Sequence, residues 1–149
     1  MRFAMLGIVA SVCAYAQALT EIKTIFVGSF GKADGADIIR EKVINRLAKS
    51  QRVKIVTVPD KADAILIGAG EVTRGWRHST SSDGNASGGT TYDATLAVRL
   101  ISKDDEILWV DEAKPTRLFL LTPSVSSSVA DKVSKNLLKA LDGGAKRKK

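Results

Sequence analysis

Few residues of this chain have the type and spacing that enzyme chemistry needs. His78 is the only histidine, and it stands next to Ser79 and five residues before Asp83. A Ser-His-Asp triad works only when its side chains are held rigidly, and a segment rich in serine and glycine cannot hold them. Residues 104–106, Asp-Asp-Glu, could pair as acid and base, but they occupy a predicted turn, where carboxylates usually face solvent. We therefore expect no catalytic residues and no enzymatic activity.

Two glycine-containing stretches approximate nucleotide-binding motifs without completing them. Residues 68–73, GAGEVT, end in threonine where a dinucleotide fingerprint has its last glycine, and a polar segment follows instead of a helix. Residues 26–33 have Phe26 at the first glycine position of a P-loop and Ala33 at its Ser/Thr position. One histidine and one cysteine, Cys13, also leave zinc without a ligand set. We expect no cofactor and no metal.

A contact surface is the one functional site that the residue types suggest. Trp76 stands between Arg74 and Arg77, at the end of a predicted strand, and His78 follows. An exposed tryptophan flanked by arginines is typical of interaction hot spots. The alternative is that Trp76 packs under the segment that follows it. We predict that Arg74, Trp76, Arg77 and His78 form an interaction surface.

The N-terminal residues 1–18 have the features of a secretory signal peptide. A short positive region precedes an apolar stretch, residues 3–14, that is too short to span a bilayer, and Ala-x-Ala cleavage sites end at Ala16 and Ala18. A membrane anchor or a buried helix is the alternative. Lipid attachment at Cys13 is the less favoured reading, because valine precedes it where a small residue is needed. The sequence predicts an exported protein, periplasmic or secreted, with no transmembrane helix in the mature chain.

Composition and charge limit the classes of partner. Hydrophobic residues make up 44% of the 149 residues and charged residues 26%, which are ordinary globular values. The formal net charge of +7 favours anionic partners such as lipid, lipopolysaccharide or nucleic acid. Nucleic acid conflicts with the signal peptide and with the lack of aromatic residues interleaved among the basic ones. We expect no nucleic-acid partner.

The hydrophobic pattern predicts one α/β (α+β) domain, residues 19–142, in the order β-α-β-β-β-β-α. The expected strands alternate or carry β-branched residues, and the expected helices repeat apolar residues at helical spacing. The strands are residues 23–30, 53–58, 62–77, 92–100 and 107–110; the helices are residues 34–50, capped by Asp34, and 128–142, capped by Ser128. The first two strands should be parallel and the last three an antiparallel meander, with two helices on one face of a mixed sheet of about five strands.

The segments between these elements are predicted from composition. Residues 78–90, HSTSSDGNASGGT, read as a flexible loop. Residues 143–149 read as a basic disordered tail. Residues 118–121, LFLL, fit either a short edge strand or an exposed apolar contact.

Three residues are expected to be structural. Gly68 and Gly70 lie two apart in the central strand, so both should face the same side and let a helix approach the backbone. Trp109 should lie in the core beside Ile107.

Four stretches resemble a family of bacterial envelope proteins: the curli-secretion CsgG-like lipoproteins, the amino-terminal domain of TolB and, more loosely, the LptE-like lipoproteins. They are IFVGSF at residues 25–30, ADAILIG at 62–68, VRLI at 98–101 and EILW at 106–109. The resemblance implies a domain that binds other proteins or builds assemblies and performs no chemistry. The chain departs from the curli-secretion type at its cysteine and at its one polar loop, which is unsuited to membrane-spanning strands.

The expected function is that of an exported, non-catalytic envelope protein that acts as an adaptor or assembly factor through protein–protein contacts with envelope proteins. The alternative is a carrier or sensor for an anionic envelope molecule such as lipid or lipopolysaccharide, bound by the positive face of the helix predicted at residues 34–50 and by the basic tail, residues 143–149.

Overall fold

A computed structural model describes residues 18–80, 82–84, 86–115 and 124–143. The predicted order of elements is confirmed, with one short 3-10 helix, η1, added between the second and third strands. The elements are β1 (Thr24–Val27), α2 (Ala36–Ser50), β2 (Lys54–Val56), η1 (Pro59–Lys61), β3 (Ala64–Thr80), β4 (Ala86–Ser102), β5 (Ile107–Ala113) and α3 (Ser124–Leu141).

The five strands form one mixed sheet in the order β2-β1-β3-β4-β5. β1 is parallel to both β2 and β3, because the chain crosses over through α2 between β1 and β2 and through η1 between β2 and β3. β3, β4 and β5 pair antiparallel, as the meander prediction required. The sequence left the pairing of the third strand open, and the structure places it beside β1.

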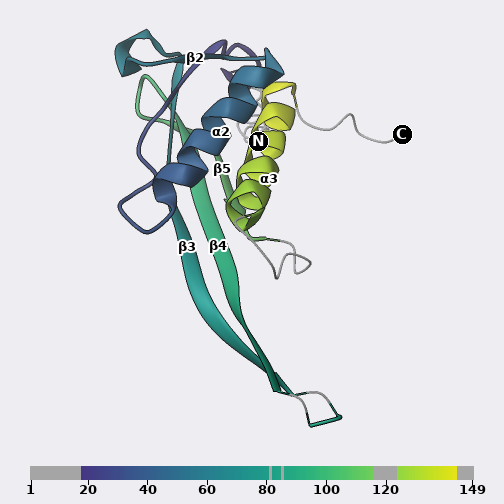
Figure 1. The fold of residues 1–149 in the computed structure, drawn as a ribbon. Helices are drawn as coiled ribbons and strands as arrows, with labels where there is room; N and C mark the ends of the chain where they lie inside the picture. The colour runs from purple at the N-terminus through teal and green to yellow at the C-terminus, as the bar shows by residue number, and fades with distance from the viewer. Residues whose placement is uncertain (1–17, 81, 85, 116–123, 144–149) are drawn as a thin grey trace, which may run out of the picture.

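Both long helices lie side by side on one face of the sheet, as predicted (Figure 1). Polar pairs join their flanks: Lys42 Nζ donates to Ser127 Oγ at 2.8 Å, and Arg46 Nε lies 3.3 Å from Asp131 Oδ1. The core fills the space between the helices and the sheet. Its fully buried side chains include Ile25, Val27, Phe30, Ile39, Val43, Leu47, Leu66, Leu96, Leu100, Val129, Val133, Leu137 and Leu141.

The helix starts differ from the predicted ones. α2 is preceded by Gly35 in the left-handed region (φ 77°) and has no side-chain cap, so the prediction that Asp34 caps it was wrong. The carbonyl of Asp34 instead accepts a hydrogen bond from the Val72 amide at 2.8 Å, which extends the pairing along β3. α3 begins at Ser124, four residues before the predicted cap at Ser128. Local capping preferences contribute only about 1 kcal/mol, so tertiary contacts such as that between Asp34 and Val72 can override them.

The predicted loop at residues 78–90 is strand over much of its length. β3 continues to Thr80, β4 begins at Ala86, and these two residues pair directly. Serine, threonine and glycine can form an antiparallel ladder without an apolar pattern, because the ladder joins backbone groups, although glycine weakens a strand. The expected flexibility of this segment stays a prediction.

Gly70 and Gly68 serve different contacts. A Cβ on Gly70 would lie 3.3 Å from Ile39 Cδ1 and 3.7 Å from Ala36 Cα, so the predicted approach of a helix is confirmed at this position. A Cβ on Gly68 would instead meet the carbonyl oxygen of Ala97 and lie 2.8 Å from Val98 Cγ1. The atoms nearest to that position belong to β4 and not to a helix, so the neighbouring strand is the first obstacle to a side chain at Gly68.

We expect Gly70→Val to lower the free energy of unfolding by about 1–3 kcal/mol through overpacking. Adding Ile39→Val, which removes the nearest carbon atom, should recover part of that loss. Gly68→Val should destabilise by a similar amount and gain nothing from Ile39→Val, since its obstacle lies on β4. Denaturant unfolding of the four variants measures these differences, and an unchanged midpoint for Gly70→Val would contradict the packing of α2 on β3.

Trp109 packs partly buried against the core, as predicted, but Ile107 does not accompany it. The β4–β5 pairing shifts register between Leu100 and Ile101, and this irregularity separates the two side chains. Ile107 pairs with Ile101 and is 51% exposed on the face that carries no helix.

Several predictions concern residues outside the described part of the chain. They are residues 1–17 of the signal peptide, including Cys13; residues 118–121; and residues 144–149 of the tail. Within the described residues, no helix has both the length and the apolar character that a membrane span requires.

Candidate functional site

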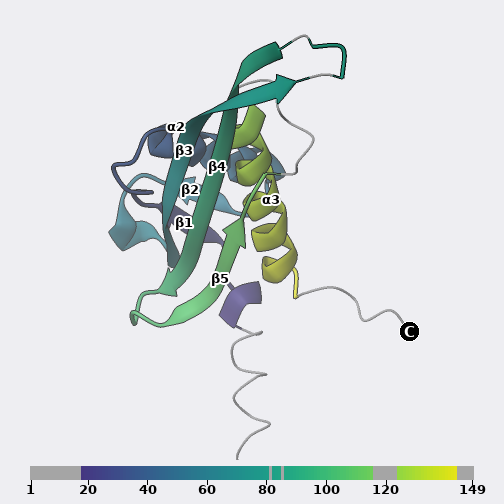
Figure 2. The same ribbon diagram turned by 90° about the horizontal axis from the view of Figure 1, so that it is seen from below.

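The β3–β4 hairpin extends well beyond the rest of the sheet (Figures 1 and 2). On the β3 side, backbone hydrogen bonds between β3 and the segment that follows β1 reach as far as Val72, whose amide donates to the Asp34 carbonyl. On the β4 side, pairing with β5 reaches Leu96. Beyond these points each strand pairs only with the other, over residues 73–80 and 86–95, which we call the ribbon. At about 3.4 Å per residue the ribbon is roughly 27 Å long.

Trp76 and Arg74 share one face of the ribbon, since they lie two positions apart on the same strand. The Trp76 side chain is 65% exposed, and Arg74 is exposed opposite the half-buried Tyr92. A Cβ on Gly88 would lie 2.6 Å from Trp76 Cζ2 and 3.3 Å from Nε1. The indole therefore lies against the backbone of β4 at a glycine, which holds the ring in place while one side of it faces solvent.

The predicted surface is only partly brought together. The backbone at Arg77 and His78 continues β3 and pairs with Gly89 and Gly88. Strand alternation assigns position 77 to the opposite face of the ribbon from position 76. Arg74 and Trp76 therefore lie on one face, position 78 of the backbone falls on that same face, and position 77 falls on the opposite one. The sequence interpretation treated the segment as a loop and could not make this distinction.

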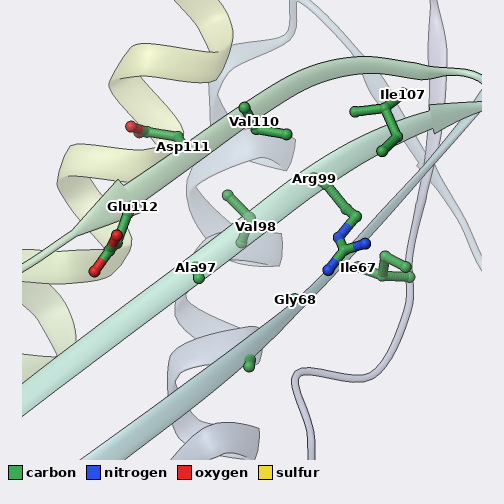
Figure 3. A pocket seen from close by; sticks show the side chains of 10 residues that line it. Ile67, Gly68, Ala97, Val98, Arg99, Ile107, Val110, Asp111 and Glu112 are labelled. Atoms are coloured by element: carbon green, nitrogen blue, oxygen red, sulfur yellow. The ribbon is translucent and has the colours of Figure 1, made fainter.

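A second exposed surface lies on the sheet face opposite the helices, and sequence analysis missed it. It is a shallow depression of about 760 Å³ over β3, β4 and β5. Its floor is low because the outward-facing residues at positions 69 and 97, which pair with each other, are both alanine. Ile107 and the 63% exposed Val110 border it on β5 (Figure 3). The signal was present in the sequence, because Ile65, Ile67 and Ala69 alternate with the core-facing residues of β3.

Arg99 projects from β4 into this depression. Figure 3 shows its side chain extending across β3 toward Ile67. Arg99 makes no hydrogen bond or ion pair with any other described residue. Glu112 lies on the same face, one strand away, and its carboxylate is 3.8 Å from the exposed Lys114 ammonium. The lining of the depression thus combines aliphatic side chains with one cation, Arg99, and two carboxylates, Glu112 and Asp111. Asp111 accepts a hydrogen bond from the Asn136 side-chain amide of α3 at 2.8 Å, so Glu112 is the carboxylate on the open face.

Among the described residues, two carboxyl groups have shifted pKa values, and both lie outside the two surfaces. The backbone amide of Lys23, which donates to Asp63 Oδ2 at 3.0 Å, lowers the pKa of Asp63, and the amide of Thr24 adds to the effect. The ammonium of Lys135 lowers the pKa of Asp131, with help from Arg46. Asp63 joins the starts of β1 and β3, and Asp131 joins α3 to α2, so both act in holding the fold. Among the described residues, no group of three His, Cys, Asp or Glu is placed to hold a metal ion.

No protein-family model and no curated protein sequence matches this chain. Solved structures similar to it include the following three. The dodecamer of a PelC point variant from Paraburkholderia phytofirmans is 22% identical, with a TM-score of 0.49, over 77% of this chain and 85% of that one. A putative neuraminyllactose-binding hemagglutinin homolog from Helicobacter pylori is 8% identical, with a TM-score of 0.48, over 95% and 89%.

The third structure, a PDZ domain protein from Parabacteroides distasonis, is 13% identical, with a TM-score of 0.46, over 79% of this chain and 31% of that one. All three TM-scores lie below 0.5, so these similarities carry no functional inference. None of the three bears the name of the CsgG-like, TolB or LptE-like proteins, and that resemblance remains a prediction.

Proposed function

We propose that this protein is an exported, non-catalytic adaptor or assembly factor of the bacterial cell envelope, and that it binds a partner protein through the ribbon. The observation that carries the proposal is the exposure of Trp76 on a two-stranded extension that no other described element covers. Export rests on the signal-peptide pattern of residues 1–18.

The ribbon is suited to protein binding for a physical reason. A two-stranded hairpin is at best marginally stable in water, because it has too little apolar surface to bury. Here the body of the sheet holds the ribbon at its base, and pairing runs to Thr80 and Ala86. Docking on a partner would remove the apolar ring of the indole from water and would give the open strand edges, with their unpaired N–H and C=O groups, a strand to pair with.

The alternative, a carrier for an anionic envelope molecule, predicts a different dependence on salt. Arg74 could contact an anion, but the same stretch of the hairpin also carries the carboxylates of Glu71 and Asp93. Binding dominated by Arg74 would weaken steeply as ionic strength rises. A contact centred on Trp76 would persist.

We expect Trp76→Ala to reduce partner binding at least about tenfold, because a buried tryptophan anchor is usually a hot spot. The measurement is the amount of envelope protein retained by the immobilised protein, at low salt and at about 0.5 M salt. Ile38→Ala is the matched control, since Ile38 is a comparably exposed apolar residue, 57% accessible, on α2. Equal loss in both variants, or none in Trp76→Ala, would place the contact elsewhere. If the wild-type protein loses its binding of envelope protein at high salt, the result would favour the alternative function, a carrier for an anionic molecule.

A further inference from the structure

The sheet face opposite α2 and α3 is an uncovered apolar layer. Sheets in compact domains bury their apolar face against a second layer, and here both long helices lie on the other side (Figure 1). Phe26, Ile65, Ile67 and Ile101 are only half-buried on this face. Val110 and Ile107 are more exposed still, at 63% and 51%. A further layer would remove these side chains from water.

We infer that this face is the interface of a homodimer, in which a second copy of the chain packs sheet against sheet. The inference rests on how the face is charged. Arg99 lies opposite Val110 in the β4–β5 ladder, and Ala97 lies opposite Glu112. These four residues form a box with Arg99 and Glu112 at diagonal corners. The patch therefore carries a positive and a negative charge that are complementary to each other in a second copy.

A two-fold axis can lie in the plane of the interface, close to the line from Ala97 to Val110. Rotation about this axis brings each of the two charges opposite the charge of opposite sign in the second copy. It places Arg99 opposite Glu112 of the partner subunit. By the same symmetry Glu112 lies opposite the partner subunit's Arg99, so the interface contains two equivalent ion pairs, as a self-complementary interface requires. Val110 then meets its own mate near the axis. The strands of the two copies cross steeply, which is the orthogonal class of sheet packing.

The same charges argue against other occupants. Arg99 has no partner among the described residues of its own chain, and its guanidinium reaches into the depression (Figure 3). An anionic ligand would pair with Arg99 but would face the carboxylates of Glu112 and Glu71 on the same side. The depression is also wide and shallow, which suits a protein surface better than a small molecule. The inference is independent of the ribbon, since Trp76 lies outside the depression.

Reversing the charge of Arg99 or of Glu112 tests the proposed contact between these two residues of different copies. Arg99→Glu puts two negative charges in the box, and Glu112→Arg puts two positive charges there. Each variant should self-associate at least about tenfold more weakly than the wild-type protein, because like charges oppose across the interface. An equimolar mixture of the two variants should form a heterodimer, since every contact then joins opposite charges. Both substitutions are at exposed positions, so the variants should keep the wild-type circular dichroism spectrum.

Sedimentation velocity of the purified protein, from about 1 to 100 µM, measures the association. Lys61→Glu and Glu21→Arg are the controls, because they change the net charge equally at exposed positions outside the depression. They should dimerise like the wild-type protein. A wild-type protein that stays monomeric throughout this range, a dimer that survives both reversals, an oligomer larger than a dimer, or a mixture that fails to associate would each overturn the inference.

Discussion

Gly35→Ala is expected to lower the free energy of unfolding by about 2–4 kcal/mol, because two separate costs meet at this residue. Gly35 has a φ of 77°, in the left-handed region that side chains disfavour. An added Cβ would also overlap Val72 Cγ2 and lie 2.8 Å from Val72 Cβ. Val72 cannot retreat easily, because its amide donates to the carbonyl of Asp34 at 2.8 Å.

Gly31→Ala separates these two costs. Gly31 has a comparable φ of 94°, but no atom lies within 4 Å of the position that a Cβ would take. Its alanine variant should therefore show the backbone strain alone, about 1–2 kcal/mol. Denaturant unfolding compares the two, with the denaturation midpoint as the readout. Equal losses in both variants would show that the contact between Gly35 and Val72 contributes nothing.

Arg52→Met is expected to cost about 2–4 kcal/mol, since one guanidinium joins three distant parts of the chain. Arg52 Nη1 donates to the Ile22 carbonyl at 3.0 Å, and Nη2 donates to the carbonyls of Thr20 at 3.2 Å and Leu141 at 2.7 Å. Arg52 Nε lies 2.8 Å from Asp142 Oδ1. Methionine keeps the apolar stem and removes every donor, so the chain before β1 and the last turn of α3 lose their common anchor.

Two controls show which part of Arg52 matters. Asp142→Asn weakens only an exposed ion pair, whose carboxylate side chain is 63% accessible, and should cost less than about 1 kcal/mol. Arg52→Lys keeps the charge but not the planar fork of donors, so it should fall between the wild-type protein and Arg52→Met. Thermal or denaturant unfolding measures all three. A stability of Arg52→Met equal to that of Asp142→Asn would assign the whole effect to the ion pair.

The sequence alone determined the type and order of the regular elements, because these depend on local periodicity. Ile39, Val43 and Leu47 recur at helical spacing, and all three are buried on α2. Ala94, Leu96, Val98 and Leu100 alternate with polar residues, and all four are buried on β4. The positive φ of Gly143 just after α3 likewise follows from a local preference.

The tertiary structure decided everything that depends on partners distant in the chain. The Ser/Gly-rich segment has no apolar pattern of its own. Its residues form strands because β3 and β4 pair with each other as far as Thr80 and Ala86. Gly35 precedes α2 in place of the predicted Asp34 cap because Val72 approaches it from β3. The order β2-β1-β3-β4-β5 places Arg99 and Glu112 on one uncovered face. Periodicity specifies which face of each element is apolar, but only the pairing of strands decides which faces lie together and which of them no helix covers.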